Sequence, residues 1–254
     1  IFRATRDTRI SGRSEFLDEI FELIHTQDQI AVLSLAPLRT RPFRTYDNLV
    51  EEFKPEGDHI PLVLSRILAE GGSDHKVSLA LDRFGEASGL FEKLRVKRLG
   101  KQPSEPFQLR VKPVAGPDAN LVDVGYGVSQ ALPIVVDSIR APNKAVVLVQ
   151  QPEVHLHPRA QAALGTFFCE LASNSEKRFV IETHSDHLLD RVRIEVAKGQ
   201  IKADDVNIAF LDRDGISVSI HQLSVDTQGN VVDAPNSYRR FFLEEEERLM
   251  LRGM

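Results

Sequence analysis

The stretch that decides the fold is AVVLVQQPEVHLHP, residues 145–158. It opens with five consecutive apolar residues, which predict a strand buried on both faces, and it turns polar at Gln150. An unbroken apolar run follows at 179–181 and a largely apolar run, with Asn207 in it, at 206–211; segments of helical periodicity lie between the runs. This alternation predicts an α/β domain whose parallel sheet is covered by helices on both faces. In such sheets, functional residues gather at the carboxyl ends of the strands.

Local periodicity predicts the other elements. A buried strand is expected at 30–35, and helices are expected at 14–25, 58–69, 159–172 and 186–198. Asp58 is the predicted cap of the second helix, and Gly199 is well placed to end the last one. An antiparallel subregion with one solvated face is expected between 76 and 112, because apolar and polar residues alternate at 77–81, 94–98 and 107–111.

Composition excludes several classes of protein. The 254 residues include a single cysteine, Cys169, which excludes an internal disulfide framework and a Cys-based zinc site. No apolar run is long enough to cross a membrane, and no signal peptide is visible. We therefore expect a cytoplasmic protein without a membrane partner. The net charge of −5 argues against a uniformly basic surface. Because the sequence starts at Ile1 and not at Met, we expect it to be part of a longer chain.

Three polar segments follow predicted strands or open a predicted helix. In 150–158, Gln150 and Gln151 occupy the positions after a strand where a Walker B motif has two acids, one for the magnesium of a nucleotide and one to polarise water. After the next strand comes ETHSDH, 182–187, whose His184 could reach a terminal phosphate. Upstream, DVGYGVSQ at 123–130 combines two glycines with a helix start, an arrangement suited to binding an anion.

The helix after this glycine segment is expected to begin near Val128 or Ser129 and to run to about Ile139. Pro133 would then lie close to its first turn, where proline is tolerated.

These segments, in this order, resemble the C-terminal half of an ABC-type ATPase domain, and most of all the AAA-family ATPases related to the OLD, RecF and SMC groups. The likeness covers about 30–220 and is strongest at 121–190; the run 35–39 also resembles a loop of this family. The resemblance implies a P-loop NTPase fold of the ABC type, with ATP and Mg²⁺ as cofactors.

The resemblance also implies roles for individual residues. Gln150 matches the magnesium-binding acid, Gln151 the catalytic acid and His184 the switch histidine. His157 lies in the stretch that matches the D-loop at a dimer interface. The signature loop, which binds the nucleotide held by the opposite subunit, is matched by Gly125, Gly127, Val128, Ser129 and Gln130.

The implied function is ATP hydrolysis coupled to nucleotide-gated dimerisation or higher oligomerisation. Many relatives act in bacterial defence against phage beside an effector such as a nuclease, and DNA is a further candidate partner. Three regions are expected: 1–120, the remainder of the N-terminal lobe with the antiparallel subregion; 121–220, with the three motifs; and 221–254, a C-terminal extension. The Walker A loop, Gly-x-x-x-x-Gly-Lys-Ser/Thr, is absent from the 254 residues and is expected upstream.

Two alternatives to an active ATPase stay open. Because Gln150 and Gln151 are neutral, the domain could sense nucleotide as a scaffold without hydrolysing it, or Gln150 could merely slow the hydrolysis. A metal-dependent hydrolase would instead use His155, His157 and His184 with nearby acids.

Three further patterns have a functional and a structural interpretation. Asp212 and Asp214 could form a metal site, but Asp-Gly favours a hairpin turn and we prefer the turn. The basic run 93–101 could meet phosphates through Arg95 and Lys97, although a solvated face is the more common outcome. The tail 238–251 reads as an amphipathic acidic helix that docks on its own domain or on a partner.

Overall fold

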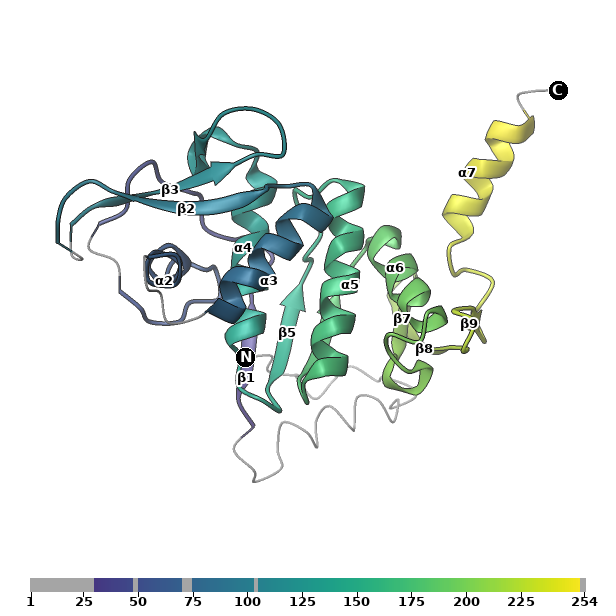
Figure 1. The fold of residues 1–254 in the computed structure, drawn as a ribbon. Coiled ribbons are helices and arrows are strands. Elements are labelled where there is room, and N and C mark those ends of the chain that lie inside the picture. The colour runs from purple at the N-terminus through teal and green to yellow at the C-terminus, as the bar shows by residue number, and fades with distance from the viewer. Residues whose placement is uncertain (1–29, 48–49, 70–74, 103–104, 252–254) are drawn as a thin grey trace. The chain divides into compact units, whose positions relative to one another are not determined.

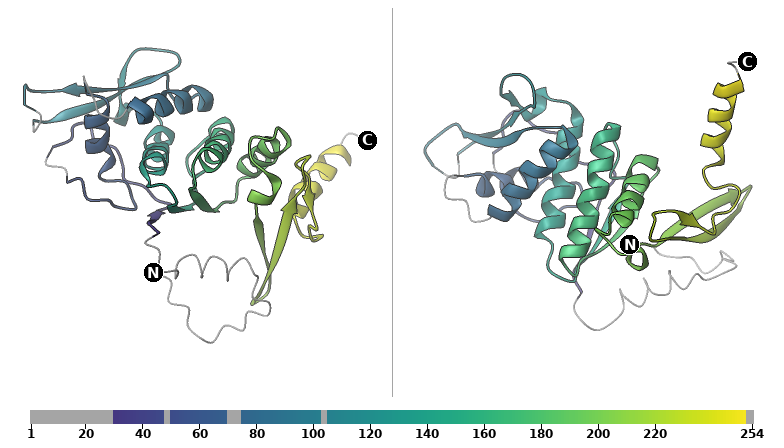
Figure 2. Two further views of the ribbon diagram at one scale, coloured as in Figure 1. Left: turned by 60° about the horizontal axis from the view of Figure 1, so that its bottom comes forward. Right: turned by 45° about the vertical axis from the view of Figure 1, so that its right-hand side comes forward.

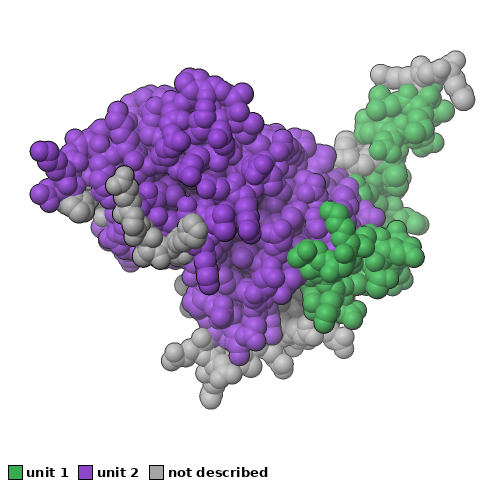
Figure 3. Space-filling model, viewed as in Figure 1, with its two compact units in different colours: residues 1–29, 196–254 green, residues 30–195 purple. Residues whose placement is uncertain are grey.

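The computed structural model describes residues 30–47, 50–69, 75–102 and 105–251. They fall into two compact units, unit 2 (30–195) and the described part of unit 1 (196–251), which are coloured separately in Figure 3. The predicted helix at 14–25 lies outside the described residues, and the predicted boundaries near 120 and 220 stay predictions. No helix among the described residues is long and apolar enough to cross a membrane.

The elements in chain order are β1 (Val32–Leu35), α2 (Ile60–Ile67), α3 (His75–Ser88), β2 (Lys93–Arg98), β3 (Phe107–Lys112), β4 (Ala119–Asn120), η1 (Leu121–Asp123), α4 (Tyr126–Arg140), β5 (Val146–Gln150), α5 (Pro158–Asn174), β6 (Arg178–Glu182), α6 (Asp186–Ala197), η2 (Ala203–Asp205), β7 (Ile208–Asp214), β8 (Ser217–Val225), β9 (Val231–Val232) and α7 (Arg240–Leu251).

A parallel sheet in the order β1-β5-β6 forms the centre of unit 2 (Figure 1). Leu35, Val147 and Val149 point from one face of this sheet into the hydrophobic core, where Phe179 and Ile181 of β6 also pack. Helices α4 and α5 lie over this face, and α3 packs on α4 and α5 (Figure 2). The parallel sheet and the covering helices confirm the predicted α/β fold class, whereas helices on the second face of the sheet stay a prediction.

A second sheet, β2-β3-β4, is antiparallel and confirms the strands predicted at 94–98 and 107–111. The strand predicted at 77–81 is wrong, because this run belongs to α3. Val77, Leu81 and Phe84 are buried at the helical spacing i, i+4, i+7, whereas Leu79 is 43% exposed. The five residues 77–81 fit the period of a strand and that of a helix equally well. The helix forms because it buries three apolar side chains in the core.

The start of α2 differs from its prediction. Its N-cap is His59, without a side-chain cap bond, and the Asp58 carboxylate instead accepts a hydrogen bond from the Thr40 hydroxyl. The loop after β1 therefore takes the side chain that was expected to cap the helix.

The start of α4 also differs. The helix begins at Tyr126, with Gly125 as N-cap, so Pro133 lies inside the helix and not near its first turn. The turn before α2 packs on this proline: Gly57 has a φ of +87°, and a Cβ there would lie 2.5 Å from Pro133 Cγ.

Unit 1 contains the antiparallel sheet β7-β8-β9. The apolar run 206–211 was predicted to be a strand of the parallel sheet, and this is wrong, because β7 pairs with β8 in a hairpin. Asp214 pairs with Ser217 across a two-residue turn that starts at Gly215, with a φ of +59°, so the turn interpretation of Asp-Gly is confirmed. The Asp212 carboxylate accepts a hydrogen bond from Ser237. The tail forms helix α7, as predicted.

The basic run of β2 lies on an exposed strand face with nearby acids. Arg95 Nη1 forms an ion pair with Asp118 Oδ2 at 2.8 Å, and Lys93 Nζ lies 3.9 Å from Asp82 Oδ2. These pairs neutralise part of the charge that a nucleic-acid backbone would attract.

Two substitutions on α3 test the helical register. Leu81 is 1% exposed, so Leu81→Ala should lower the free energy of unfolding by about 2–5 kcal/mol, because a cavity remains in the core. Leu79→Ala, on the exposed side, should cost only about 0.5 kcal/mol. Urea denaturation of both variants measures the difference; equal losses would mean that the two side chains share one face, as in a strand.

Candidate functional site

The carboxyl ends of β5 and β6 lie side by side. Gln150 ends β5 and is the register partner of Glu182, which ends β6. Gln151 follows with a φ of +43°, and its N–H donates to the Glu182 carbonyl at 2.8 Å. The sheet pairing therefore extends one residue beyond β5, which holds both glutamines at the edge where α/β sheets bind ligands.

Glu153 joins the turn after β5 to the turn after β6. Its Oε2 accepts a hydrogen bond from the Thr183 hydroxyl at 2.9 Å, and its Oε1 accepts one from the His184 N–H at 2.7 Å. The imidazole of His184 is exposed at this edge. The carboxylate thus fixes the backbone that presents the predicted switch histidine, and both of its oxygens are occupied.

Arg39, in the loop after β1, reaches the same place from the other side of β5. Its side chain is buried, and Nη2 donates to the carbonyl oxygens of Gln150 at 3.2 Å and Gln151 at 3.3 Å. Burial lowers the pKa of Arg39 to about 10, and the nearby Glu153 carboxylate opposes this shift. Nε and Nη1 are buried without a hydrogen-bond partner among the described residues.

The amide of Gln130 attaches α4 to the backbone of Arg39. The Arg39 N–H donates to Gln130 Oε1, and Gln130 Nε2 donates to the Arg39 carbonyl, both at 3.3 Å. This two-bond contact connects the predicted signature segment, through Arg39, to the end of β5.

The segment predicted as signature loop packs against the stretch that follows β5. The rings of Tyr126 and His155 lie 5.6 Å apart, and a Cβ on Gly127 would come within 3.0 Å of the His155 carbonyl oxygen. Gly127 is therefore required for this close approach. Gly125 and Tyr126 are exposed at the helix N-terminus, where backbone N–H groups favour an anion.

The other three residues predicted to bind nucleotide lie inside α4. Val128, Ser129 and Gln130 are buried; the Ser129 hydroxyl donates to the Tyr126 carbonyl at 2.9 Å, and Gln130 is bonded to Arg39. In the described structure, their side chains support the exposed start of the helix.

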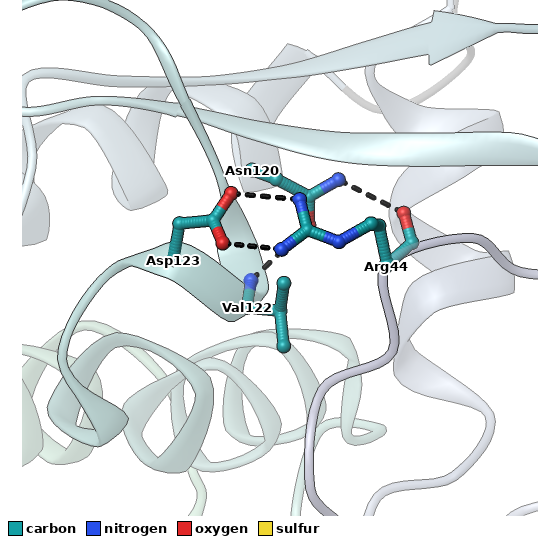
Figure 4. A network of polar contacts seen from close by, with 4 residues as sticks. All are labelled: Arg44, Asn120, Val122 and Asp123. Carbon is teal, nitrogen blue, oxygen red and sulfur yellow. Dashed lines mark hydrogen bonds and ion pairs between the residues drawn. The ribbon is translucent and has the colours of Figure 1, made fainter.

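An exposed ion pair lies at the first residue of the predicted signature segment, 123–130. Arg44 donates from Nη1 and Nη2 to the two carboxylate oxygens of Asp123, at 2.9 and 2.5 Å (Figure 4). These hydrogen bonds lower the pKa of Asp123. Asn120 adds a hydrogen bond from its amide to the Arg44 carbonyl and accepts one from the Val122 N–H. The loop after β1 is thereby tied to the start of the signature segment.

His157, predicted at a dimer interface, is the N-cap of α5. Its Nδ1 accepts a hydrogen bond from the Ala160 N–H at 3.4 Å. Across the part of the chain that the structure describes, no group of three or more His, Cys, Asp or Glu side chains could hold a metal ion.

Sequence reasoning missed the roles of Arg39 and Glu153. The available signal for Arg39 was weak, because Arg39 and Arg41 both lie between two prolines shortly after a buried strand. Glu153 is part of the motif at 150–158, but its bridging role was not predicted. Both act through contacts with segments more than 25 residues away, and local spacing does not reveal such contacts.

Replacing Glu153 tests its bridging role. Glu153→Gln keeps the shape but removes the charge and one acceptor oxygen, so it should lower the unfolding free energy by about 1–3 kcal/mol. The matched control is Glu176→Gln, whose carboxylate makes only an exposed ion pair with Lys144 and should matter by less than about 1 kcal/mol. Chemical denaturation compares the two; a Glu153 variant as stable as the control would contradict the bridge.

Comparison with known proteins gives a family match and distant structural likenesses. A family model described as "AAA domain, putative AbiEii toxin, Type IV TA system" matches residues 14–190. A search of curated proteins finds no match.

Among solved structures, one SMC ATPase, described through ATP-driven dimerisation and DNA-stimulated activation, is 14% identical with a TM-score of 0.43, over 68% of this chain and 91% of that chain. The Smc head of Pyrococcus furiosus with an extended coiled coil, bound to the C-terminal domain of ScpA, is 14% identical with a TM-score of 0.42, over 68% and 37%. A further Smc head, bound to the winged-helix domain of ScpA, is 11% identical with a TM-score of 0.43, over 65% of this chain and 50% of that chain. The chain thus spans half or less of the last two.

The family model covers more than half of the chain and includes all three polar segments. The chain belongs to this family of AAA domains and is an AAA-type ATPase domain.

Proposed function

We propose that this domain is the signature and Walker B portion of an ABC-type ATPase, which binds ATP between two subunits and closes on it. The observation that supports this most directly is the convergence of three segments. Tyr126 and Gly127 pack against His155, and Glu153 in the same stretch bonds Thr183 and His184. Such a junction would let a change at the phosphate end of the site reach the signature segment.

The exposed groups have distinct roles in this proposal. Backbone N–H groups at the start of α4, near Gly125 and Tyr126, donate to the terminal phosphate of the nucleotide held by the opposite subunit. His184 lies at the carboxyl end of β6 and donates to the terminal phosphate from its own side. When hydrolysis removes that phosphate, both contacts are lost and the closed dimer opens.

The output of this cycle is control of a partner. The partner in this proposal is an effector, such as a nuclease, used in defence against phage; the family description itself names a putative toxin of a Type IV TA system. DNA is a further candidate partner. ATP-driven closure supplies the conformational change that such an effector would sense.

Magnesium accompanies ATP in most such sites, where it neutralises phosphate charge. Gln150 offers only a neutral amide oxygen at the position expected for the metal, and the Arg39 guanidinium bonds to the carbonyl of the same residue. Gln150 alone is therefore a poor ligand for a divalent cation. A magnesium ion would fit beside Gln150 only if another residue at the carboxyl ends of the strands supplied a negative charge.

Sedimentation of the full-length protein tests the dimer. A non-hydrolysable ATP analogue should convert monomers to dimers, and Tyr126→Ala should weaken this conversion at least about tenfold, because the side chain lies exposed at the proposed interface. Val114→Ala, at an exposed apolar residue in the turn between β3 and β4, is the control and should dimerise normally. Nucleotide-independent behaviour of the wild type would refute nucleotide-gated dimerisation.

Two neutral side chains in the acid positions favour a second candidate, a nucleotide sensor without turnover. We expect the protein to bind ATP and to release phosphate well below about 1 s⁻¹, the low end of ordinary turnover. Gln150→Glu should raise the rate if hydrolysis is the native activity. Phosphate release separates the candidates: no turnover in either protein favours the sensor, and rapid turnover by the wild type contradicts the expected impairment.

A further inference from the structure

Glu182 lies beside Gln150 on one face of the parallel sheet. The two residues are register partners in the β5–β6 pair, and neighbouring strands lie about 4.8 Å apart. Val149 and Ile181, one position earlier in each strand, point into the core. Because side chains alternate between the faces of a sheet, Gln150 and Glu182 leave the opposite face together.

The Glu182 carboxylate is available, unlike that of Glu153. Both oxygens of Glu153 accept hydrogen bonds from the turn after β6. Glu182 is exposed, and its carboxylate forms no hydrogen bond or ion pair with another residue of the described ranges. Its backbone is nevertheless fixed, because the Gln151 N–H donates to the Glu182 carbonyl. A free carboxylate on a held backbone can bind a ligand without first breaking a contact.

One cationic and two acidic side chains contribute charge at this edge. Arg39 Nη2 contacts the Gln150 and Gln151 carbonyls from the β1 side, where its positive charge repels a cation. Glu182 ends β6, and Glu153, in the turn after β5, lies near Arg39 and offsets part of its charge. A cation between Gln150 and Glu182 would therefore lie beside a carboxylate on the side of β5 away from β1.

The two side chains offer the ligand types that magnesium prefers. Mg²⁺ binds oxygen, takes one or two carboxylates from the protein, and fills its remaining positions with phosphate oxygens and water. The amide oxygen of Gln150 and the carboxylate of Glu182 meet this requirement. We propose that Glu182 supplies the negative charge that Gln150 lacks, and that the two together hold the divalent cation of the bound nucleotide. This inference rests on the proposed nucleotide site.

The test measures binding and not turnover. A fluorescent, non-hydrolysable ATP analogue is titrated into the full-length protein with Mg²⁺ and, separately, with EDTA. The wild type should bind at least about tenfold more tightly with Mg²⁺, and Glu182→Gln should lose this gain while its affinity in EDTA stays the same or rises. Glu170→Gln, at an exposed carboxylate on α5, is the control and should keep the gain.

A charge exchange makes the test specific. In the double variant Gln150→Glu, Glu182→Gln, the acid returns to β5 and the Mg²⁺-dependent gain should return with it. Electron paramagnetic resonance of Mn²⁺ bound with the analogue gives a second readout of cation binding. A Glu182→Gln variant that keeps the full gain overturns the inference, as does a wild type that binds equally in Mg²⁺ and EDTA. A wild type that binds the analogue in neither condition refutes the proposed function itself.

Discussion

The arrangement of the candidate site depends on the buried guanidinium of Arg39. Its side chain bonds the last carbonyls of the β5 strand and the following turn, and its backbone bonds the amide of Gln130 in α4. Taking this cation out of water is costly, and its lowered pKa reflects that cost. Two carbonyl acceptors offset the cost only in part, since Nε and Nη1 have no partner among the described residues. The distance between the signature segment and β5 is set by these contacts.

A second set of contacts joins the stretch after β5 to the turn after β6 and to the start of α4. Glu153 bonds the turn after β6, and Tyr126 packs on His155 two residues further along the same stretch. The stretch after β5 therefore contacts both the signature segment and the turn that presents His184. These contacts are the two hydrogen bonds of Glu153 and one ring contact, so few groups join the two segments.

The sequence predicted elements where one physical requirement dominates. Continuous apolar runs such as 145–149 must be buried on both faces, so their parallel pairing was correct. The run 77–81 fits two periods, and contacts with the core decided for a helix. The run 206–211, which contains Asn207, pairs within a hairpin, because its downstream neighbour is a strand and not a helix. The motif residues were predicted from their spacing and their roles stay predictions, whereas Arg39 and Glu153 make distant contacts that spacing does not encode.

The relation between Gln150 and Glu182 illustrates the same limit for the chemistry. Along the chain, the two are 32 positions apart, and the motif at 150–158 shows a glutamine where an acid is expected. Across the sheet, the same glutamine has a carboxylate as its neighbour on the next strand. Electrostatic energy depends on distance in space, so a charge missing from one strand can be supplied by the adjacent one. The absence of both acids from the motif therefore does not by itself make the edge neutral, because the sheet register places a carboxylate beside Gln150.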